Sequence, residues 1–264
     1  MEKGELKENL IDRILNNKWE DDILPLKTNL VYYKCAIMEI EAKFKALDIQ
    51  FNVSHDRNPI ESIKTRLKSV ERIIKKLNKY NFPLTLESIE ENIWDIAGIR
   101  VICSFTEDIY FLEKSLIEQD DIRLIMRKDY IENPKPNGYR SLHLRIEIPV
   151  FLSSGKKWVK AEIQFRTIAM DFWASLEHKI RYNKQMTENI DEINKELLEC
   201  AKMCTELDKK MQKVKNKSNV ERFINRNEII EILILVERCS KTQLLITSIP
   251  IFPRKIMIWA SKTK

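Results

Sequence analysis

Glycine is scarce in this chain of 264 residues, which contains only four glycines. They are Gly4, Gly98, Gly138 and Gly155, too far apart to form a P-loop, a dinucleotide-binding G-x-G-x-x-G turn or the glycine loop of a protein kinase. If the protein binds nucleotides, it therefore holds their phosphates by other means.

Histidine is scarcer still, since the chain contains only His55, His143 and His178. A hydrolase centre built from several histidines around a metal ion is therefore not expected. The dipeptide His55-Asp56 resembles one found in metal-dependent phosphohydrolases, but it has no companion histidines, and we interpret it as coincidence.

Long apolar runs are also missing. The longest lies near Ile229–Val236 and is too short to span a bilayer, while Met1–Leu10 has no apolar signal core. The five cysteines are an odd number, and without an export signal they indicate reduced thiols. We therefore expect a cytoplasmic protein without membrane segments.

The charge of the chain is only mildly unbalanced. It has 46 Lys and Arg against 40 Asp and Glu, a net charge of +6, with 44% hydrophobic and 33% charged residues. This composition suits a soluble, helix-rich protein. The small basic excess permits polyphosphate or nucleic-acid partners but requires neither.

Hydrophobic periodicity predicts alternating groups of helices and strands. We predict helices over residues 5–50, 60–77, 107–118, 167–182 and 188–216, and strands over 99–105, 122–128, 142–150 and 158–166. Two prolines and Asn137-Gly138 predict a loop over 129–139. The last helix carries an apolar stripe that indicates packing and an oligomer contact: Ile190, Ile193, Leu197, Cys200, Cys204, Leu207, Met211 and Val214. Cys200 and Cys204 lie on this stripe, which favours core packing over metal binding.

The strand over 158–166 is the most informative segment. Val159, Ala161, Ile163 and Phe165 alternate with Lys160, Glu162, Gln164 and Arg166, so one face is polar. The strand leads into a helix with a polar stripe of Asp171, Ser175 and His178. From spacing alone, a functional site and an ordinary solvated face are about equally consistent with this pattern.

Asp95 is the second candidate, at the mouth of an apolar strand in IWDIAGIR. A carboxylate there, near another carboxylate on a neighbouring strand, suits Mg²⁺, which takes one or two carboxylates and substrate phosphates. A turn or cap aspartate is an equally good interpretation.

Two further segments remain open. The loop KPNGYRSLH places Tyr139 beside hydrogen-bonding groups, which suits either a purine platform or an incidental tyrosine near a hairpin. The basic run in the predicted helix over 60–77 is either a solvated helix face or a surface for a triphosphate. Its members are Lys64, Arg66, Lys68, Arg72, Lys75 and Lys76.

Four blocks, taken together and in order, resemble the synthetase domain of the RelA/SpoT homologue family, particularly its small single-domain members. They are NPIESIKTRLKS (58–69), IWDIAGIRVIC (93–103), KDYIENPKPNGYRSLHL (128–144) and AEIQFRTIAMDFWASLEH (161–178). The resemblance covers roughly residues 55–183.

The resemblance implies an α/β (α+β) fold, with a mixed sheet of nucleotidyltransferase type flanked by N- and C-terminal helices. We accordingly divide the chain into N-terminal helices (1–54), a synthetase core (55–183), a packing or oligomerisation helix (184–225) and an atypical apolar tail (226–264), which has no counterpart in the resemblance. It also implies a homo-oligomer, as a tetramer, and no alarmone hydrolase activity.

The implied activity is Mg²⁺-dependent transfer of the β,γ-pyrophosphate of ATP to the 3′-hydroxyl of GTP or GDP, which gives pppGpp or ppGpp and AMP. The resemblance assigns ATP to Arg66, Lys68 and Arg100, and Mg²⁺ to Asp95 and Glu162. It assigns GTP or GDP to Lys128, Lys135, Asn137, Tyr139, His143, Gln164 and Ala174. Glu162 is the candidate general base, and the sequence leaves open whether it also binds the metal.

Two other functions compete with this one, a non-enzymatic RNA-binding regulator and a nucleotidyltransferase acting on RNA ends. The first accounts for the basic charge but not for Asp95 and Glu162, because paired carboxylates repel a phosphate backbone unless a metal intervenes. The second needs an RNA track, which the sequence does not indicate. Nucleic acid is therefore not the expected partner.

Overall fold

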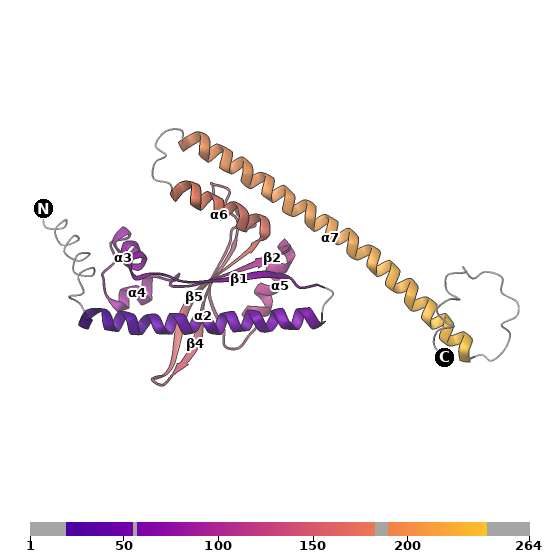
Figure 1. The fold of residues 1–264 in the computed structure, drawn as a ribbon, viewed down its shortest axis with the longest axis horizontal. Helices are drawn as coiled ribbons and strands as arrows, with labels where there is room; N and C mark the ends of the chain where they lie inside the picture. The colour runs from indigo at the N-terminus through magenta and orange to yellow at the C-terminus, as the bar shows by residue number, and fades with distance from the viewer. Residues whose placement is uncertain (1–19, 55–56, 183–189, 242–264) are drawn as a thin grey trace. The chain divides into compact units, whose positions relative to one another are not determined.

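The computed structural model describes residues 20–54, 57–182 and 190–241 (Figure 1). Its elements are α2 (Glu20–Ser54), β1 (Ile60–Leu67), α3 (Val70–Lys79), α4 (Leu86–Asn92), β2 (Ala97–Cys103), α5 (Thr106–Ile117), β3 (Arg123–Asp129), β4 (Leu142–Leu152), β5 (Gly155–Thr167), α6 (Ile168–Tyr182) and α7 (Ile190–Lys241). The dipeptide His55-Asp56, which we interpret as coincidence, lies outside the described residues.

The five strands form one mixed sheet in the order β1-β2-β5-β4-β3. Only the central pair, β2 and β5, runs parallel, while the other neighbours are antiparallel. The predicted fold class, a mixed sheet with flanking helices, is confirmed.

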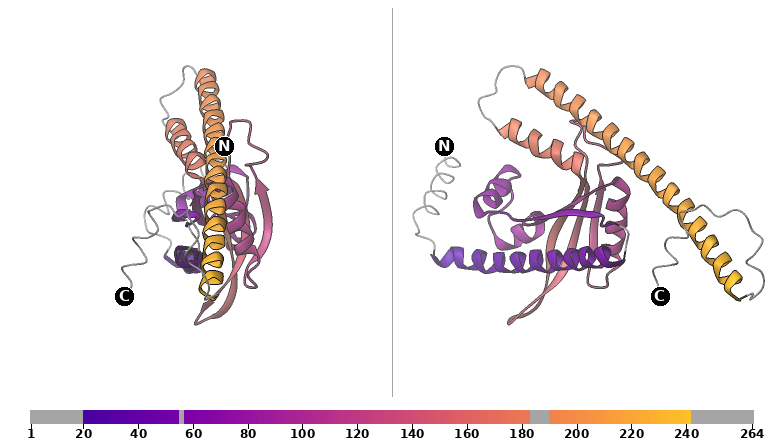
Figure 2. Two further views of the ribbon diagram at one scale, coloured as in Figure 1. Left: turned by 90° about the vertical axis from the view of Figure 1, so that its right-hand side faces the viewer. Right: turned by 45° about the vertical axis from the view of Figure 1, so that its right-hand side comes forward.

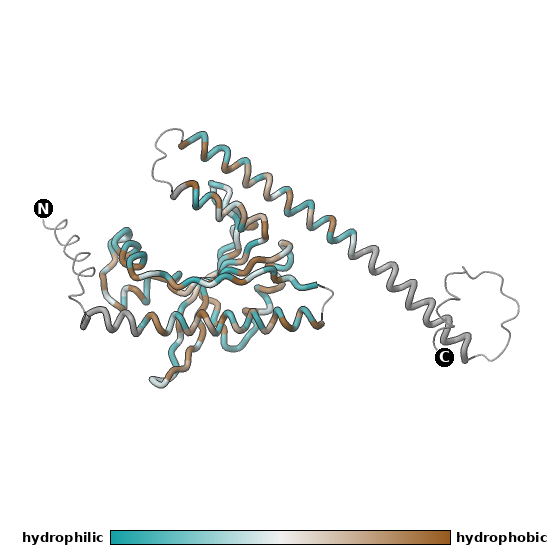
Figure 3. The backbone as a smooth tube through the Cα atoms, viewed as in Figure 1, coloured by the Kyte–Doolittle hydropathy of each residue, from teal (hydrophilic) through white to brown (hydrophobic). Residues whose placement is uncertain are grey.

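One face of the sheet forms the hydrophobic core. The alternating residues Ile99, Val101, Ile163 and Phe165 are fully buried there. Helix α2 crosses β4 and β5 and contacts four of the strands, with Phe44 packed edge-on against Phe165 (Figure 1). In Figure 3, α2 alternates between brown and teal, as expected of a helix with one buried side. Helix α5 adds apolar side chains to the same core.

The predicted helix over 60–77 is wrong in its first half. Residues 60–67 form β1, which pairs along its length with β2, and the helix begins only at Val70. The apolar residues over 60–77 also satisfy a helical period, but pairing with a neighbouring strand overrides that local signal. As a consequence, Lys64 and Arg66 project from a strand.

The other predicted helices and strands of the core are found within a few residues of their expected bounds. Helix α7 is continuous through residue 225, where the apolar tail was expected to begin. By its internal contacts the chain divides into two units, at Gln212 and Lys213, and the second unit contains the C-terminal part of α7. Residues 242–264 of the predicted tail lie outside the described residues.

Among the residues that the structure describes, no helix combines the length and the apolar composition needed to cross a lipid bilayer.

Helix α6 continues from β5 at the end opposite the β4–β5 hairpin (Figure 2) and packs against the first part of α7. Trp173 donates a hydrogen bond from its indole nitrogen to the carbonyl of Leu197, at 2.8 Å. Leu197 and Ala201 are buried there, and Cys204 packs beside them. The core-packing interpretation is wrong for Cys200, which is exposed, because the inward face of α7 runs through Ala201 instead.

Gly138 lies in tight contact with α7. Its φ is +87°, and a Cβ atom at this position would lie 2.5 Å from the Cβ of Ala201. Gly155 in the β4–β5 turn also has a positive φ, of +105°, but an added Cβ there would have no atom within 4 Å. An alanine would therefore be strained in its backbone at both positions, but it would collide with a neighbouring atom only at Gly138.

We expect Gly138→Ala to destabilise the protein more than Gly155→Ala. The positive φ costs roughly 1–3 kcal/mol at either position, and the collision with α7 adds about 1–3 kcal/mol at Gly138 alone. Urea unfolding of the two variants beside the wild type measures the difference. Equal losses would mean that the loop does not press on α7.

Candidate active site

The face of the sheet opposite the core carries one polar side chain from each strand in a continuous row. Cross-strand pairing places these five residues side by side: Lys64, Arg100, Gln164, His143 and Lys128. A second row lies beside the first and consists of Arg66, Gly98, Glu162, Arg145 and Met126. The predicted polar face of β5 therefore belongs to a polar surface that spans the whole sheet.

Asp95 lies just before β2 and is surrounded by cations. Its carboxylate accepts hydrogen bonds from Lys68 and, at 2.7 Å, from Lys76, and the guanidinium of Arg66 is 3.9 Å away. Burial alone would raise the pKa of Asp95, but the hydrogen bonds from the two lysines outweigh it and lower the pKa to about 2. Asp95 is therefore ionised at neutral pH.

Glu162 lies at the centre of the polar surface, with each carboxylate oxygen near one partner. His143 Nδ1 is 3.3 Å from Oε1, and Gln164 donates to Oε2 at 3.4 Å. Burial would raise the pKa of Glu162, and the charge of Asp95 acts in the same direction. Burial is the largest single effect, but the interactions with His143 and the hydrogen bond from Gln164 together outweigh it, so the pKa lies below its usual value.

These two carboxylates fit a magnesium site in which the substrate completes the coordination. Within the described ranges, no group of three or more His, Cys, Asp or Glu side chains could hold a metal ion. Mg²⁺ is commonly bound by one or two carboxylates together with substrate phosphates. Asp95 and Glu162 lie close enough for the charge of one to affect the other. That they share a metal ion stays a prediction.

A hollow of about 160 Å³ opens beside Glu162 over β3 and β4. It is lined by Met126, Lys128, Tyr130, Lys135, His143, Arg145 and Glu162. Four residues that the sequence assigned to the site thus meet in one place. They are two lysines, one histidine and one glutamate, namely Lys128, Lys135, His143 and Glu162. We call it the β3–β4 hollow.

The loop before β4 borders this hollow. Lys135 lies over the rings of Tyr130 and Tyr139, at 4.6 and 5.0 Å from their centroids. Asn137 accepts a hydrogen bond from the backbone of Tyr139 and donates one to Glu177 on α6. Ala174 is not part of the hollow, because it is buried against α7.

The comparisons with known proteins agree with this geometry. A family profile described as "Region found in RelA / SpoT proteins" matches residues 65–187. GTP pyrophosphokinase YwaC of Bacillus subtilis is 48% identical over 189 residues, which cover 72% of this chain and 90% of that protein. GTP pyrophosphokinase YjbM of the same organism is 33% identical over 202 residues, with 76% and 90% covered.

This chain belongs to the RelA/SpoT family.

Solved structures give the same result. Small alarmone synthetase 1 of Bacillus subtilis, bound to its product pppGpp, matches with a TM-score of 0.67 and 33% identity, over 73% of this chain and 97% of that one. Small alarmone synthetase 2 of Bacillus subtilis matches with a TM-score of 0.65 and 46% identity, over 73% and 98%. These matches confirm the family resemblance that the four sequence blocks predicted.

Sequence reasoning missed several residues of the polar surface. Lys76 lies on α3 and donates to Asp95, a contact that the sequence did not predict although it named Lys76 in the basic run. Asp171 accepts hydrogen bonds from Lys64, at 2.8 Å, and from Arg100 and Arg166, at 3.1 and 3.0 Å. The polar stripe on the helix after β5 was the available signal, although Ser175 is half-buried and His178 is exposed.

Within the described residues, the guanidinium groups of Arg100 and Arg166 each have a hydrogen-bond donor without a partner. In the part of the chain that the structure describes, the Nε atoms of both are buried and lack an acceptor. Buried donors without partners are costly.

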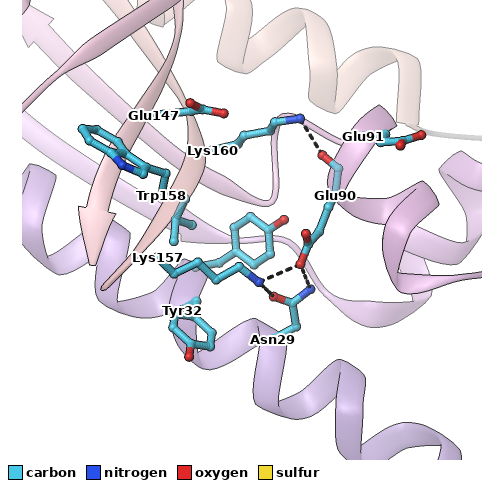
Figure 4. A pocket seen from close by; sticks show the side chains of 10 residues that line it. Asn29, Tyr32, Glu90, Glu91, Glu147, Lys157, Trp158 and Lys160 are labelled. Carbon is cyan, nitrogen blue, oxygen red and sulfur yellow. Dashed lines mark hydrogen bonds and ion pairs between the residues drawn. The ribbon is translucent and has the colours of Figure 1, made fainter. Parts of the chain in front are cut away.

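A larger hollow, of about 220 Å³, lies elsewhere, where β5 extends past the start of β2 (Figure 4). There Lys157 donates to Glu90, at 2.7 Å, and to Asn29, while Lys160 donates to the carbonyl of Glu90. These four lining residues thus pair with one another, and the hollow contains none of the site residues described above.

We expect Asp171→Asn to destabilise this RelA/SpoT family member by about 3 kcal/mol at pH 7, because it leaves three cations without their counter-charge. Burial would raise the pKa of Asp171, but its cationic partners lower it below 3.8. The stabilisation is therefore present above pH 3.8, and the deficit of the variant should shrink as the pH falls below that value.

Urea unfolding at pH 7, 5 and 3 measures this deficit. Asp121→Asn is the matched control, because Asp121 pairs with Lys43 at a more exposed position and should lose less than about 1 kcal/mol. A deficit that stays constant down to pH 3 would contradict the role given to Asp171.

Proposed function

We propose that this protein transfers the β,γ-pyrophosphate of ATP to the 3′-hydroxyl of GTP or GDP, with release of AMP. The observation that carries this proposal is the position of ionised Glu162 between two groups of basic side chains. One group surrounds Asp95 on the β1–β2 side, and the other lines the β3–β4 hollow. This arrangement suits a reaction between two phosphorylated substrates, one on each side of a carboxylate.

We assign ATP to the first group and the guanine nucleotide to the second. Arg66, Lys68 and Lys76 supply positive charge for the triphosphate. In the β3–β4 hollow, Lys128 and Lys135 supply it for the acceptor. Beside the hollow, Tyr139 offers a ring for guanine, with Lys135 at 5.0 Å from its centroid. The assignment to GTP or GDP draws support from the relatives named GTP pyrophosphokinase.

The reaction forms a bond between the 3′-oxygen and the β-phosphorus of ATP, and it breaks the bond between that phosphorus and the oxygen bridging to the α-phosphate. Glu162 accepts the proton of the 3′-hydroxyl, and AMP leaves with the bridging oxygen. Asp95 and Glu162 would hold Mg²⁺, which neutralises phosphate charge when bound. The remaining work of the protein is positioning and charge neutralisation.

An RNA-binding function is not favoured, because Asp95 and Glu162 stand in the middle of the basic surface. ATP and guanine nucleotides are metabolites of the cytoplasm, so we place the protein there. Incubation with radiolabelled ATP, GDP and Mg²⁺, followed by separation of nucleotides, tests the activity. The appearance of label in ppGpp supports the proposal, and its absence with both GDP and GTP overturns it.

We expect Glu162→Gln to abolish synthesis while the protein stays folded and binds ATP. The substitution is nearly isosteric and removes only the charge that takes the proton, a loss worth about 10²–10⁴-fold in rate. Initial rates, thermal unfolding and ATP binding are measured together. Glu147→Gln is the matched control on the neighbouring strand and should leave the rate near wild type. Near wild-type synthesis by Glu162→Gln would remove Glu162 from the mechanism.

We also propose that the protein forms a homotetramer through α7. Part of the predicted stripe, namely Ile190, Leu207 and Met211, is about half exposed within one chain. Light scattering at micromolar concentration should therefore give a mass near four times 31.4 kDa. Leu207→Glu with Met211→Glu should yield a smaller species, while Lys209→Glu, on the other side of the helix, should not. A monomeric wild type would contradict this.

A further inference from the structure

Arg166 is a buried cation to which neither the sequence nor the proposed mechanism gives a function. Its side chain is only 5% exposed and lies on β5, on the same face as Gln164 and Glu162. One end of the guanidinium donates to Asp171 at 3.0 Å. The other terminal nitrogen, Nη2, points along the strand toward the centre of the site and makes two hydrogen bonds.

The first of these hydrogen bonds begins a short chain to Glu162. Nη2 of Arg166 donates to Oε1 of Gln164 at 3.2 Å, and Nε2 of Gln164 donates to Oε2 of Glu162 at 3.4 Å. Glu162, Gln164 and Arg166 occupy every second position of β5, so the geometry of the strand fixes the spacing between them.

The second hydrogen bond begins a longer chain to the other oxygen of Glu162. Nη2 of Arg166 donates to the hydroxyl of Tyr139 at 2.8 Å. That hydroxyl lies 2.8 Å from Nε2 of His143, and Nδ1 of His143 lies 3.3 Å from Oε1 of Glu162. The two chains therefore start from one nitrogen and end on the two oxygens of one carboxylate.

When the imidazole of His143 is neutral, the chemistry of the groups sets the direction of each hydrogen bond in the longer chain. A guanidinium only donates and an ionised carboxylate only accepts. In the neutral imidazole, Nδ1 of His143 must therefore carry the proton that faces Glu162, and Nε2 must accept from the Tyr139 hydroxyl. Every donor thus points away from Arg166 and toward Glu162.

We propose that Arg166 is a positioning residue that fixes both carboxylate oxygens of Glu162 through these two chains. Tyr139 then has two separate roles. Its ring faces the guanine nucleotide, and its hydroxyl links Arg166 to His143 by hydrogen bonds. A carboxylate that takes a proton in the reaction must be held in place, and small displacements cost rate without weakening substrate binding. This inference rests on the proposed function.

The experiment separates the hydroxyl of Tyr139 from its ring. Tyr139→Phe keeps the ring and breaks the longer chain, so kcat should fall about tenfold while the KM values for GDP and ATP stay within about twofold of wild type. Tyr139→Ala removes the ring as well and should also raise the KM for GDP. Tyr32→Phe, which removes a hydroxyl bonded to Ser154 away from the site, is the matched control and should change neither constant.

Arg166→Lys tests whether both chains depend on Arg166. The ammonium group keeps the positive charge but lacks the planar guanidinium that donates to Tyr139 and Gln164. Its kcat should fall further than that of Tyr139→Phe, and adding Tyr139→Phe to it should cause less than about a twofold additional loss. Additive losses would overturn the proposal. So would a Tyr139→Phe enzyme with wild-type kcat, or one in which only the KM for GDP changes. These Tyr139→Phe results decide the question even where Arg166→Lys does not fold.

A second readout does not depend on activity. The chain has only three histidines, so His143→Gln identifies the imidazole signals of His143 in a nitrogen NMR spectrum. We expect the tautomer protonated at Nδ1 in the wild type and a mixture of tautomers in Tyr139→Phe. The tautomer protonated at Nε2 in the wild type would overturn the proposal. Wild-type protein that shows the expected tautomer but makes no ppGpp would instead refute the proposed function.

Discussion

The parallel register between β2 and β5 fixes the position of the central groups of the candidate site. It places Glu162 beside Gly98 and Gln164 beside Arg100, in the middle of the sheet. Because side chains alternate along a strand, a slip by one residue would turn Phe165 away from Phe44 and bury Glu162 in the core. The packing of α2 against the sheet thus holds the polar surface in place from the opposite face.

The electrostatics of the surface follow from the same layout. Asp95 faces three cations, Arg66, Lys68 and Lys76, and Asp171 faces another three, Lys64, Arg100 and Arg166. Each carboxylate orders a cluster that keeps an excess of two positive charges. Burial lowers the pKa of Lys68 against the opposing effect of Asp95, so this cation is partly desolvated before any ligand binds. Such clusters attract polyphosphates strongly because their charges are already oriented.

Sequence reasoning found the parts of the site that are encoded locally. The alternation around Glu162 and the strand after Asp95 were both recognised, and the order of the four blocks identified the family. It did not pair Lys76 with Asp95, and it missed the contact of Lys64 with Asp171, which depends on β1 being a strand. The residues of β1 also satisfy a helical period, and only pairing with β2 decides between the two. The two chains from Arg166 to Glu162 were equally inaccessible, since they require the register of β4 on β5.

Helix α7 is mechanically connected to this site within the first unit of the chain. Gly138 presses against Ala201 and is followed directly by Tyr139, whose ring packs beside the α6–α7 contact. A shift of α7 toward the loop cannot be absorbed at Gly138, where space for even one methyl group is missing. It must therefore move Tyr139, and with it the hydroxyl that links Arg166 to His143. The packing of α7 against the loop and the orientation of Glu162 are for this reason parts of one arrangement rather than independent features.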